Sequence, residues 1–281
     1  MASLMVFAAT AVAEPLPIFD AHLHYNADSR AVYSPGAVVE ILDHARVTRA
    51  LLSSTPNDGT RVLHAAYPER FVPFLRPYRD DADRTRWHGD VSLPGWLEHE
   101  LAQGEYRGIG ELHLNGAPRD SAVLRRVLAL AVTRDLVVQV HADAAAIDAL
   151  YALDPEVKIL WAHAGMNEPP ARIGKMLARH ATLAVELSLR DDIAPGGRLD
   201  PAWRALLARH SDRFLLGTDT WTAARWNAVA VNAAAARQWL KQLTPAQAEA
   251  IAYRNGERLF PSRPSPRADG RTAVSNSHGQ T

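Results

Sequence analysis

Eight short runs rich in β-branched and apolar residues recur along the chain, and a segment with helical patterning follows each run. The interval between successive runs is long enough for the crossover helix that joins two parallel strands. Eight such units within residues 15–260 predict one domain with the (β/α)8 fold, the TIM barrel. The runs expected to form strands span 18–24, 48–54, 70–78, 107–114, 136–143, 158–165, 182–189 and 213–220.

Several helix starts are explicit in the sequence. Ser34-Pro35 and Asp200-Pro201 each place a capping residue before a proline, the arrangement preferred at a helix N-terminus. Thr244 and Gln247 have the spacing of a capping box. An open doubly wound sheet is the alternative architecture, but the glycine-rich turn of its nucleotide-binding forms is absent after the first expected strand.

Composition limits the chemistry and the partners. The 281 residues include no cysteine, which excludes disulfides and thiolate metal sites. The 31 basic and 31 acidic residues balance, which disfavours binding to nucleic acid through phosphate contacts. No run approaches the roughly 18 apolar residues of a membrane span. A small-molecule substrate is the expected partner, and a homo-oligomer stays open.

The two ends read as segments outside the barrel. Residues 1–14 begin with an uncharged stretch that closes on Ala11-Val12-Ala13, as at the cleavage site of a secretory signal peptide. The usual basic start is missing, so a disordered leader is the alternative. We expect export to the periplasm or the medium, with a cytoplasmic location as the alternative. Residues 261–281 have little apolar content and predict a disordered tail.

Polar residues gather where the expected strands end, and in a barrel the carboxyl ends of the strands carry the chemistry. His22 and His24 share one face of the first strand, as Glu111 and His113 share one face of the fourth. Each such residue alone has an ordinary structural explanation. Together, on five strands, they predict a divalent metal site, with Zn²⁺ the favoured ion, one or two in number. The candidate ligands are His22, His24, Glu111, His141, His163 and Asp219.

Three motifs resemble the amidohydrolase superfamily of metal-dependent TIM-barrel hydrolases, in the amidohydrolase-related branch that includes aminocarboxymuconate-semialdehyde decarboxylase. "FDAHLH" is similar to the branch's first-strand D-x-H-x-H signature, and "LLGTDTW" to its eighth-strand aspartate motif. "IAYRNGERLF" resembles its closing helix, with Gly256 in place of the usual alanine. The resemblance spans about residues 16–260. It implies that His22, His24 and Asp219 hold the first metal.

The resemblance leaves two arrangements open for the remaining ligands. "GIGELHL" is also similar to the glutamate-bearing strand of TatD-type deoxyribonucleases, which implies that Glu111 bridges to a second ion held by His141 and His163. In the mononuclear, decarboxylase-like arrangement, His141 completes a single site and His163 is an acid/base group. A carbamylated lysine bridge is excluded, because no lysine stands at the carboxyl end of an expected strand.

The function expected from these residues is hydrolysis of a small carboxylic ester, amide or lactone by a metal-activated water. Asp219 would accept the proton of that water and pass it to the leaving group, and His163 would ligate or stabilise an oxyanion. A decarboxylase on the same scaffold is the alternative. A non-catalytic metal-binding barrel is a third hypothesis from another class.

Residues near the strand ends are candidates for substrate contact and support. Arg76, His113, Arg190 and Trp221 are the candidate substrate-binding residues. Two segments, 79–95 and 191–200, are candidate lids. Trp161 is expected to point inward beneath His163. Asp20 is expected to support the ligands from one step deeper in the barrel.

Overall fold

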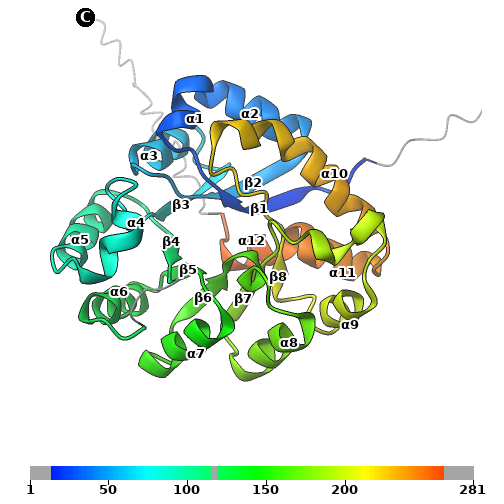
Figure 1. The fold of residues 1–281 in the computed structure, drawn as a ribbon. Helices are drawn as coiled ribbons and strands as arrows, with labels where there is room; N and C mark the ends of the chain where they lie inside the picture. The colour runs from blue at the N-terminus through cyan, green and yellow to red at the C-terminus, as the bar shows by residue number, and fades with distance from the viewer. Residues whose placement is uncertain (1–13, 115–118, 263–281) are drawn as a thin grey trace, which may run out of the picture.

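The computed structural model describes residues 14–114 and 119–262, so the expected leader, up to residue 13, and the tail from residue 263 lie outside the described residues. One sheet of eight parallel strands runs in sequential order, and a bridge between Asp20 and Leu216 joins the last strand to the first. The predicted (β/α)8 barrel is confirmed (Figure 1). The strands are β1 (Ile18–Leu23), β2 (Val47–Leu52), β3 (Phe71–Leu75), β4 (Gly108–His113), β5 (Val137–His141), β6 (Lys158–Trp161), β7 (Leu183–Glu186) and β8 (Phe214–Leu215).

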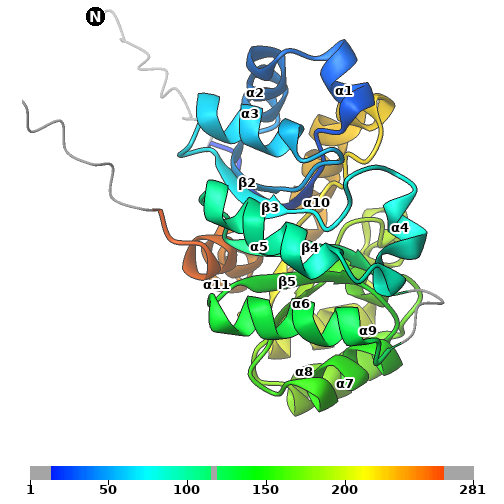
Figure 2. The same ribbon diagram turned by 90° about the vertical axis from the view of Figure 1, so that its left-hand side faces the viewer.

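Helices surround the strands on all sides, and Figure 2 shows them stacked along the outside of the barrel. The three predicted helix starts are confirmed, since Ser34, Asp200 and Thr244 each accept a hydrogen bond from a backbone N–H in the first turn. No helix of the described ranges is long and apolar enough to cross a membrane. The helices are α1 (Ala27–Val32), α2 (Pro35–His44), α3 (Asp58–Ala66), α4 (Asp83–Arg86), α5 (Leu93–Gln103), α6 (Ala122–Thr133), α7 (Ala144–Leu153), α8 (Pro170–Arg179), α9 (Pro201–Arg209), α10 (Val229–Leu240), α11 (Pro245–Glu249) and α12 (Asn255–Leu259).

Two apolar layers hold the barrel together. The larger layer lies between the strands and the helices, and the smaller one fills the barrel interior. Within the interior, the ring of Phe260 packs on Phe19 and Phe74, with ring centroids 6.0 and 5.5 Å away. Gly256 is required beside this cluster, because a Cβ there would lie 2.2 Å from the Phe19 ring. The glycine that stands where the resembled motif has alanine thus leaves room for the Phe19 ring on β1.

Four strands end three or more residues before the expected carboxyl end. The run 70–78 forms a strand only to Leu75, the run 158–165 only to Trp161, the run 182–189 only to Glu186, and the run 213–220 only over Phe214–Leu215. His163 and Asp219 follow β6 and β8 with φ of 55° and 53°, in the left-handed region, where a chain leaves the extended conformation of a strand.

This break in alternation corrects the prediction for Trp161. The side chain is buried in the outer layer, and its Nε1–H donates to the Ala142 carbonyl at 2.7 Å. Trp161 and His163 do not share a face, because residues 162–165 form a 3-10 turn instead of continuing the strand.

Candidate metal centre

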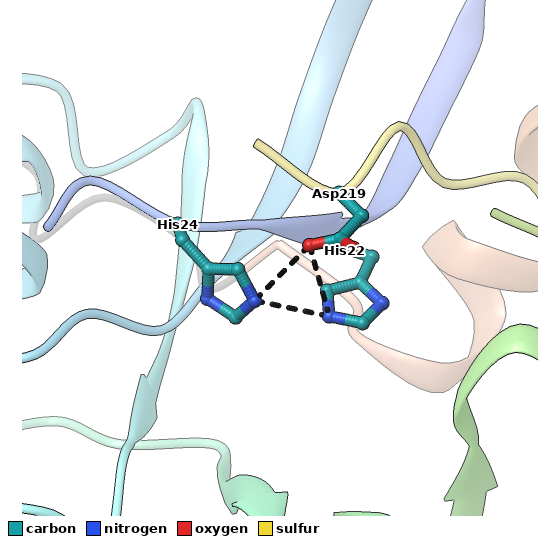
Figure 3. A group of neighbouring side chains, drawn as sticks. All are labelled: His22, His24 and Asp219. Carbon is teal, nitrogen blue, oxygen red and sulfur yellow. Dashed lines mark hydrogen bonds and ion pairs between the residues drawn. The ribbon is translucent and has the colours of Figure 1, made fainter. Parts of the chain in front are cut away.

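His22 on β1, His24 directly after β1, and an aspartate that follows β8 meet at the carboxyl end of the barrel (Figure 3). The Nε2 atoms of His22 and His24 are 3.1 Å apart. Asp219 Oδ1 lies 3.8 Å from the first of these nitrogens and 3.4 Å from the second. All three side chains are buried, and each turns a donor atom toward the space between them.

Glu111 supplies a fourth donor atom to the same space. Its Oε2 lies 3.6 Å from His22 Nε2 and 3.7 Å from His24 Nε2. Four ligands at about 2.0–2.1 Å from a tetrahedral ion stand roughly 3.4 Å from one another. The separations among these imidazole and carboxylate donors, from 3.1 to 3.8 Å, therefore fit a Zn²⁺-type ion.

The second oxygen of Glu111 faces another pair of imidazoles. Oε1 lies 3.0 Å from His141 Nδ1 and 3.3 Å from His163 Nε2. The Glu111 carboxylate thus stands between two sets of nitrogen ligands, one on each oxygen. The structure brings all six residues of the predicted ligand set together, from five strands, at one end of the barrel.

Hydrogen bonds at the far side of each ring fix the orientation of three imidazoles. His24 Nδ1 lies 2.8 Å from the Ser53 carbonyl, an acceptor, and 3.0 Å from Arg76 Nη1, a donor; with the ring proton on Nδ1, the lone pair of Nε2 faces the centre. His22 Nδ1 lies 2.9 Å from Glu186 Oε2, and His163 Nδ1 lies 2.8 Å from Ser188 Oγ. Partners of this kind set the tautomer and direction of metal-binding histidines.

Glu186, at the end of β7, is a site residue that the sequence reasoning did not identify. Its carboxylate is fully buried and accepts from His22 Nδ1, from the His163 N–H and from the Ser188 hydroxyl and N–H. A Cβ on Gly217 would lie 2.1 Å from Glu186 Oε1, so a glycine is needed for the carboxylate to fit. The available signal was a single charged residue inside the apolar run "TLAVELSL".

The centre carries an excess of buried negative charge. Burial alone would raise the pKa of Glu111, but the surrounding imidazoles hold that pKa well below its ordinary value. Burial lowers the pKa of His22, yet Asp219, Glu111 and Glu186 outweigh this and hold it well above its ordinary value. Three carboxylates thus face the Arg76 guanidinium and, without a metal, a protonated His22, which leaves a net negative charge in a buried site. Such an excess is stabilised by a cation.

Asp20 supports the backbone rather than the rings. Its carboxylate accepts from the His22 N–H at 3.0 Å and from the Thr218 N–H and hydroxyl at 3.1 and 2.6 Å. These bonds tie β1 to the segment after β8, which carries Asp219. Burial raises the pKa of Asp20 to about 7, although its hydrogen bonds act in the opposite direction.

Two of the candidate substrate-binding residues lie beside the centre. Arg76 is buried, with Nη2 3.3 Å from Glu111 Oε2 and Nη1 3.0 Å from His24 Nδ1. His113 has a partly exposed side chain, with Nε2 3.6 Å from Glu111 Oε2. Burial lowers the pKa of His113 to about 3, so its ring is neutral at physiological pH.

The other two candidates lie elsewhere in the loops. Arg190 donates to Asp192 and to the carbonyls of Ala164 and Glu168, and it stacks on Trp203. Its guanidinium holds the loops after β6 and β7 together. Trp221 follows Asp219 and is 51% exposed.

Comparisons with known proteins agree with this architecture. A model of the amidohydrolase family matches residues 19–262. A crystal structure of a probable 2-pyrone-4,6-dicarboxylic acid hydrolase from Acinetobacter baumannii, with citric acid bound, has a TM-score of 0.60 at 16% identity and covers 87% of this chain and 99% of that one. A Burkholderia multivorans amidohydrolase with bound HEPES has a TM-score of 0.57 at 17% identity, over 86% of this chain and 98% of that one.

A third structure, amidohydrolase 2 from Bifidobacterium longum subsp. infantis, has a TM-score of 0.51 at 13% identity and covers 87% of this chain and 98% of that one. At these identities the likeness is one of fold. A comparison with curated proteins gives no significant match.

Proposed function

The chain belongs to the amidohydrolase family, and from this premise we propose that it is a metal-dependent hydrolase of a small carboxylic ester, amide or lactone. The observation that carries the proposal is the set of four donors, from His22, His24, Asp219 and Glu111, whose atoms lie 3.1 to 3.8 Å from the β1-side imidazole nitrogens at the carboxyl end of the barrel. The buried negative charge around them favours a bound divalent cation.

We assign roles from the positions of the donor atoms. His22, His24, Asp219 and Glu111 Oε2 would hold one ion. Glu111 Oε1, His141 and His163 would hold a second ion, or His163 would remain free to donate a hydrogen bond. A bound divalent ion lowers the pKa of a coordinated water to about 7 and polarises a carbonyl.

Asp219 is our candidate for the proton-transfer group. Its backbone N–H donates to the His22 carbonyl at 2.8 Å, and its carboxylate lies beside both His22 and His24. The carboxylate accepts a proton from the attacking water at one oxygen and returns it to the departing oxygen or nitrogen.

The substrate class follows from the guanidinium beside the centre. Arg76 is buried within 3.3 Å of Glu111, and Nε has no hydrogen-bond partner among the described residues. A buried donor of this kind favours a substrate with a carboxylate. The Acinetobacter structure is named for a dicarboxylic acid lactone and contains a tricarboxylic acid, which supports the same class for this chain.

Metal analysis followed by turnover in labelled water tests the proposal. The purified protein should contain Zn²⁺ or a similar ion, and chelation should abolish turnover that added Zn²⁺ or Mn²⁺ restores. A panel of lactones and esters bearing carboxylates, 2-pyrone-4,6-dicarboxylate included, supplies the substrates. In ¹⁸O-labelled water, the organic product of hydrolysis carries the ¹⁸O label. A decarboxylase instead releases CO₂, and its organic product carries no ¹⁸O label. Absence of metal and of activation by metal would contradict both reactions.

A further inference from the structure

The hydroxyl of Tyr78 fixes the tautomer of His113. Within the described part of the chain, this hydroxyl has two hydrogen-bond partners, and both belong to His113. The backbone N–H of His113, 2.8 Å away, can only donate, so the hydroxyl oxygen accepts there. The hydroxyl proton is then left for the second partner, the ring Nδ1 at 3.1 Å. Nδ1 is therefore an acceptor, and the ring proton of neutral His113 is on Nε2.

We propose that His113 is a hydrogen-bond donor to an oxygen of the bound substrate, and that it is not a metal ligand. Its Nε2–H lies at the edge of the centre, 3.6 Å from Glu111 Oε2, which is too long for a hydrogen bond. The side chain is 20% exposed, so the N–H is open to a carbonyl or carboxylate oxygen placed beside Glu111. This assignment rests on the proposed function for the presence of a substrate there.

Three contacts hold the donor in place. The indole Nε1–H of Trp87, a fully buried residue of the segment 79–95, donates to the His113 carbonyl at 3.1 Å. The Tyr78 hydroxyl holds the backbone N–H, and the His113 ring stacks on His141 with centroids 4.8 Å apart. The segment 79–95, which the sequence suggested as a lid, thus also supports this histidine.

The competing assignment makes His113 a ligand. Donor atoms of Glu111, His113 and His141 lie within 4.8 Å of one another, which allows a metal ion in principle. Coordination through Nε2 needs a lone pair there and moves the proton to Nδ1. The Tyr78 hydroxyl would then accept twice, and its own proton would have no acceptor among the described residues although the side chain is buried. Leaving a buried donor unpaired is unfavourable, which argues against coordination.

The tautomer is measured directly by NMR of ¹⁵N-histidine-labelled protein, with and without Zn²⁺. His113 is identified by the signals missing from His113→Gln. We expect an Nε2–H tautomer that persists when Zn²⁺ is added. Tyr78→Phe should shift His113 toward a mixture of tautomers, whereas Tyr151→Phe, which removes a buried hydroxyl bonded to Thr182, should leave it unchanged. A proton on Nδ1, or loss of the Nε2–H on adding Zn²⁺, overturns the proposal.

Kinetics of the Zn²⁺-loaded protein supply the second test, with p-nitrophenyl acetate and the carboxylate-bearing lactones as probes. His113→Ala should lower kcat/KM by about 10²–10³-fold, as loss of one oxyanion donor does, with the metal content unchanged. His113→Gln, which restores an N–H near the same place, should recover at least tenfold. Equal activity of His113→Ala and the wild type refutes the donor role. Failure of the wild type on every probe would count against the proposed function, while the NMR result would still decide the tautomer.

Discussion

Replacing Glu186 with Gln should weaken metal binding without unfolding the barrel. The carboxylate accepts at Oε2 from His22 Nδ1 and the His163 N–H, and at Oε1 from the Ser188 N–H. An amide keeps the shape but turns one acceptor oxygen into a donor, so at least one of these bonds becomes a contact between two donors. With the amide nitrogen at the Oε2 position, the ring of His22 loses its fixed direction and the turn at His163 shifts; with the nitrogen at the Oε1 position, it meets the Ser188 N–H.

The expected loss of Zn²⁺ affinity follows from the number of metal ligands that the Glu186 carboxylate holds in place. Loss of the outer partner of a metal-bound histidine lowers metal affinity by about 10–100-fold. Glu186 holds one ligand ring and the backbone of another, so we expect the upper part of this range, about 2–2.7 kcal/mol. The unpaired buried donor should also lower the free energy of unfolding of the metal-free protein by about 1–3 kcal/mol.

Competition with a chromophoric chelator at pH 7 gives the Zn²⁺ affinity, and thermal unfolding of the metal-free protein gives the stability. Glu249→Gln is the matched control, because it removes a partly exposed carboxylate whose ion-pair partner among the described residues is Arg254. It should change neither the Zn²⁺ affinity nor, by more than a few tenths of a kcal/mol, the stability. A folded Glu186→Gln variant with wild-type Zn²⁺ affinity would refute the positioning role of this carboxylate.

Three further predictions concern the ligands and the packing. Asp219→Asn should lower kcat by about 10³-fold or more while circular dichroism stays native, since the proton acceptor is lost. Gly256→Ala should lower the free energy of unfolding by about 1–3 kcal/mol, because the added Cβ would meet the Phe19 ring at 2.2 Å. A lower melting temperature of the variant measures this loss of stability. The raised pKa of His22 stabilises the metal-free protein fully below about pH 6.5 and loses this effect as pH rises through the raised pKa. The melting temperature of the metal-free protein should therefore fall on the alkaline side, and bound Zn²⁺, which excludes that proton, should remove the dependence on His22.

The barrel could be predicted because its signals are local and repeated. Each apolar run marks a strand, and explicit caps such as Ser34 and Asp200 mark helix starts. The side chains that gather at the centre could be anticipated for the same reason, since parallel strands bring their carboxyl ends to one edge. The hydrogen bonds that orient them could not, because Glu186 and Tyr78 act through partners far away in the sequence.

The left-handed turns at the ends of β6 and β8 explain why face alternation fails near the centre. A non-glycine residue in this region costs about 1–3 kcal/mol and persists only where neighbouring contacts hold it. At His163 the N–H donates to Glu186 at 3.1 Å, and at Asp219 the N–H donates to the His22 carbonyl at 2.8 Å. Glu186, which holds the turn at His163, also orients the ring of His22, and the backbone of His22 holds the turn at Asp219. The backbone and the rings of the centre form one connected unit, so a substitution at Glu186 should disturb both.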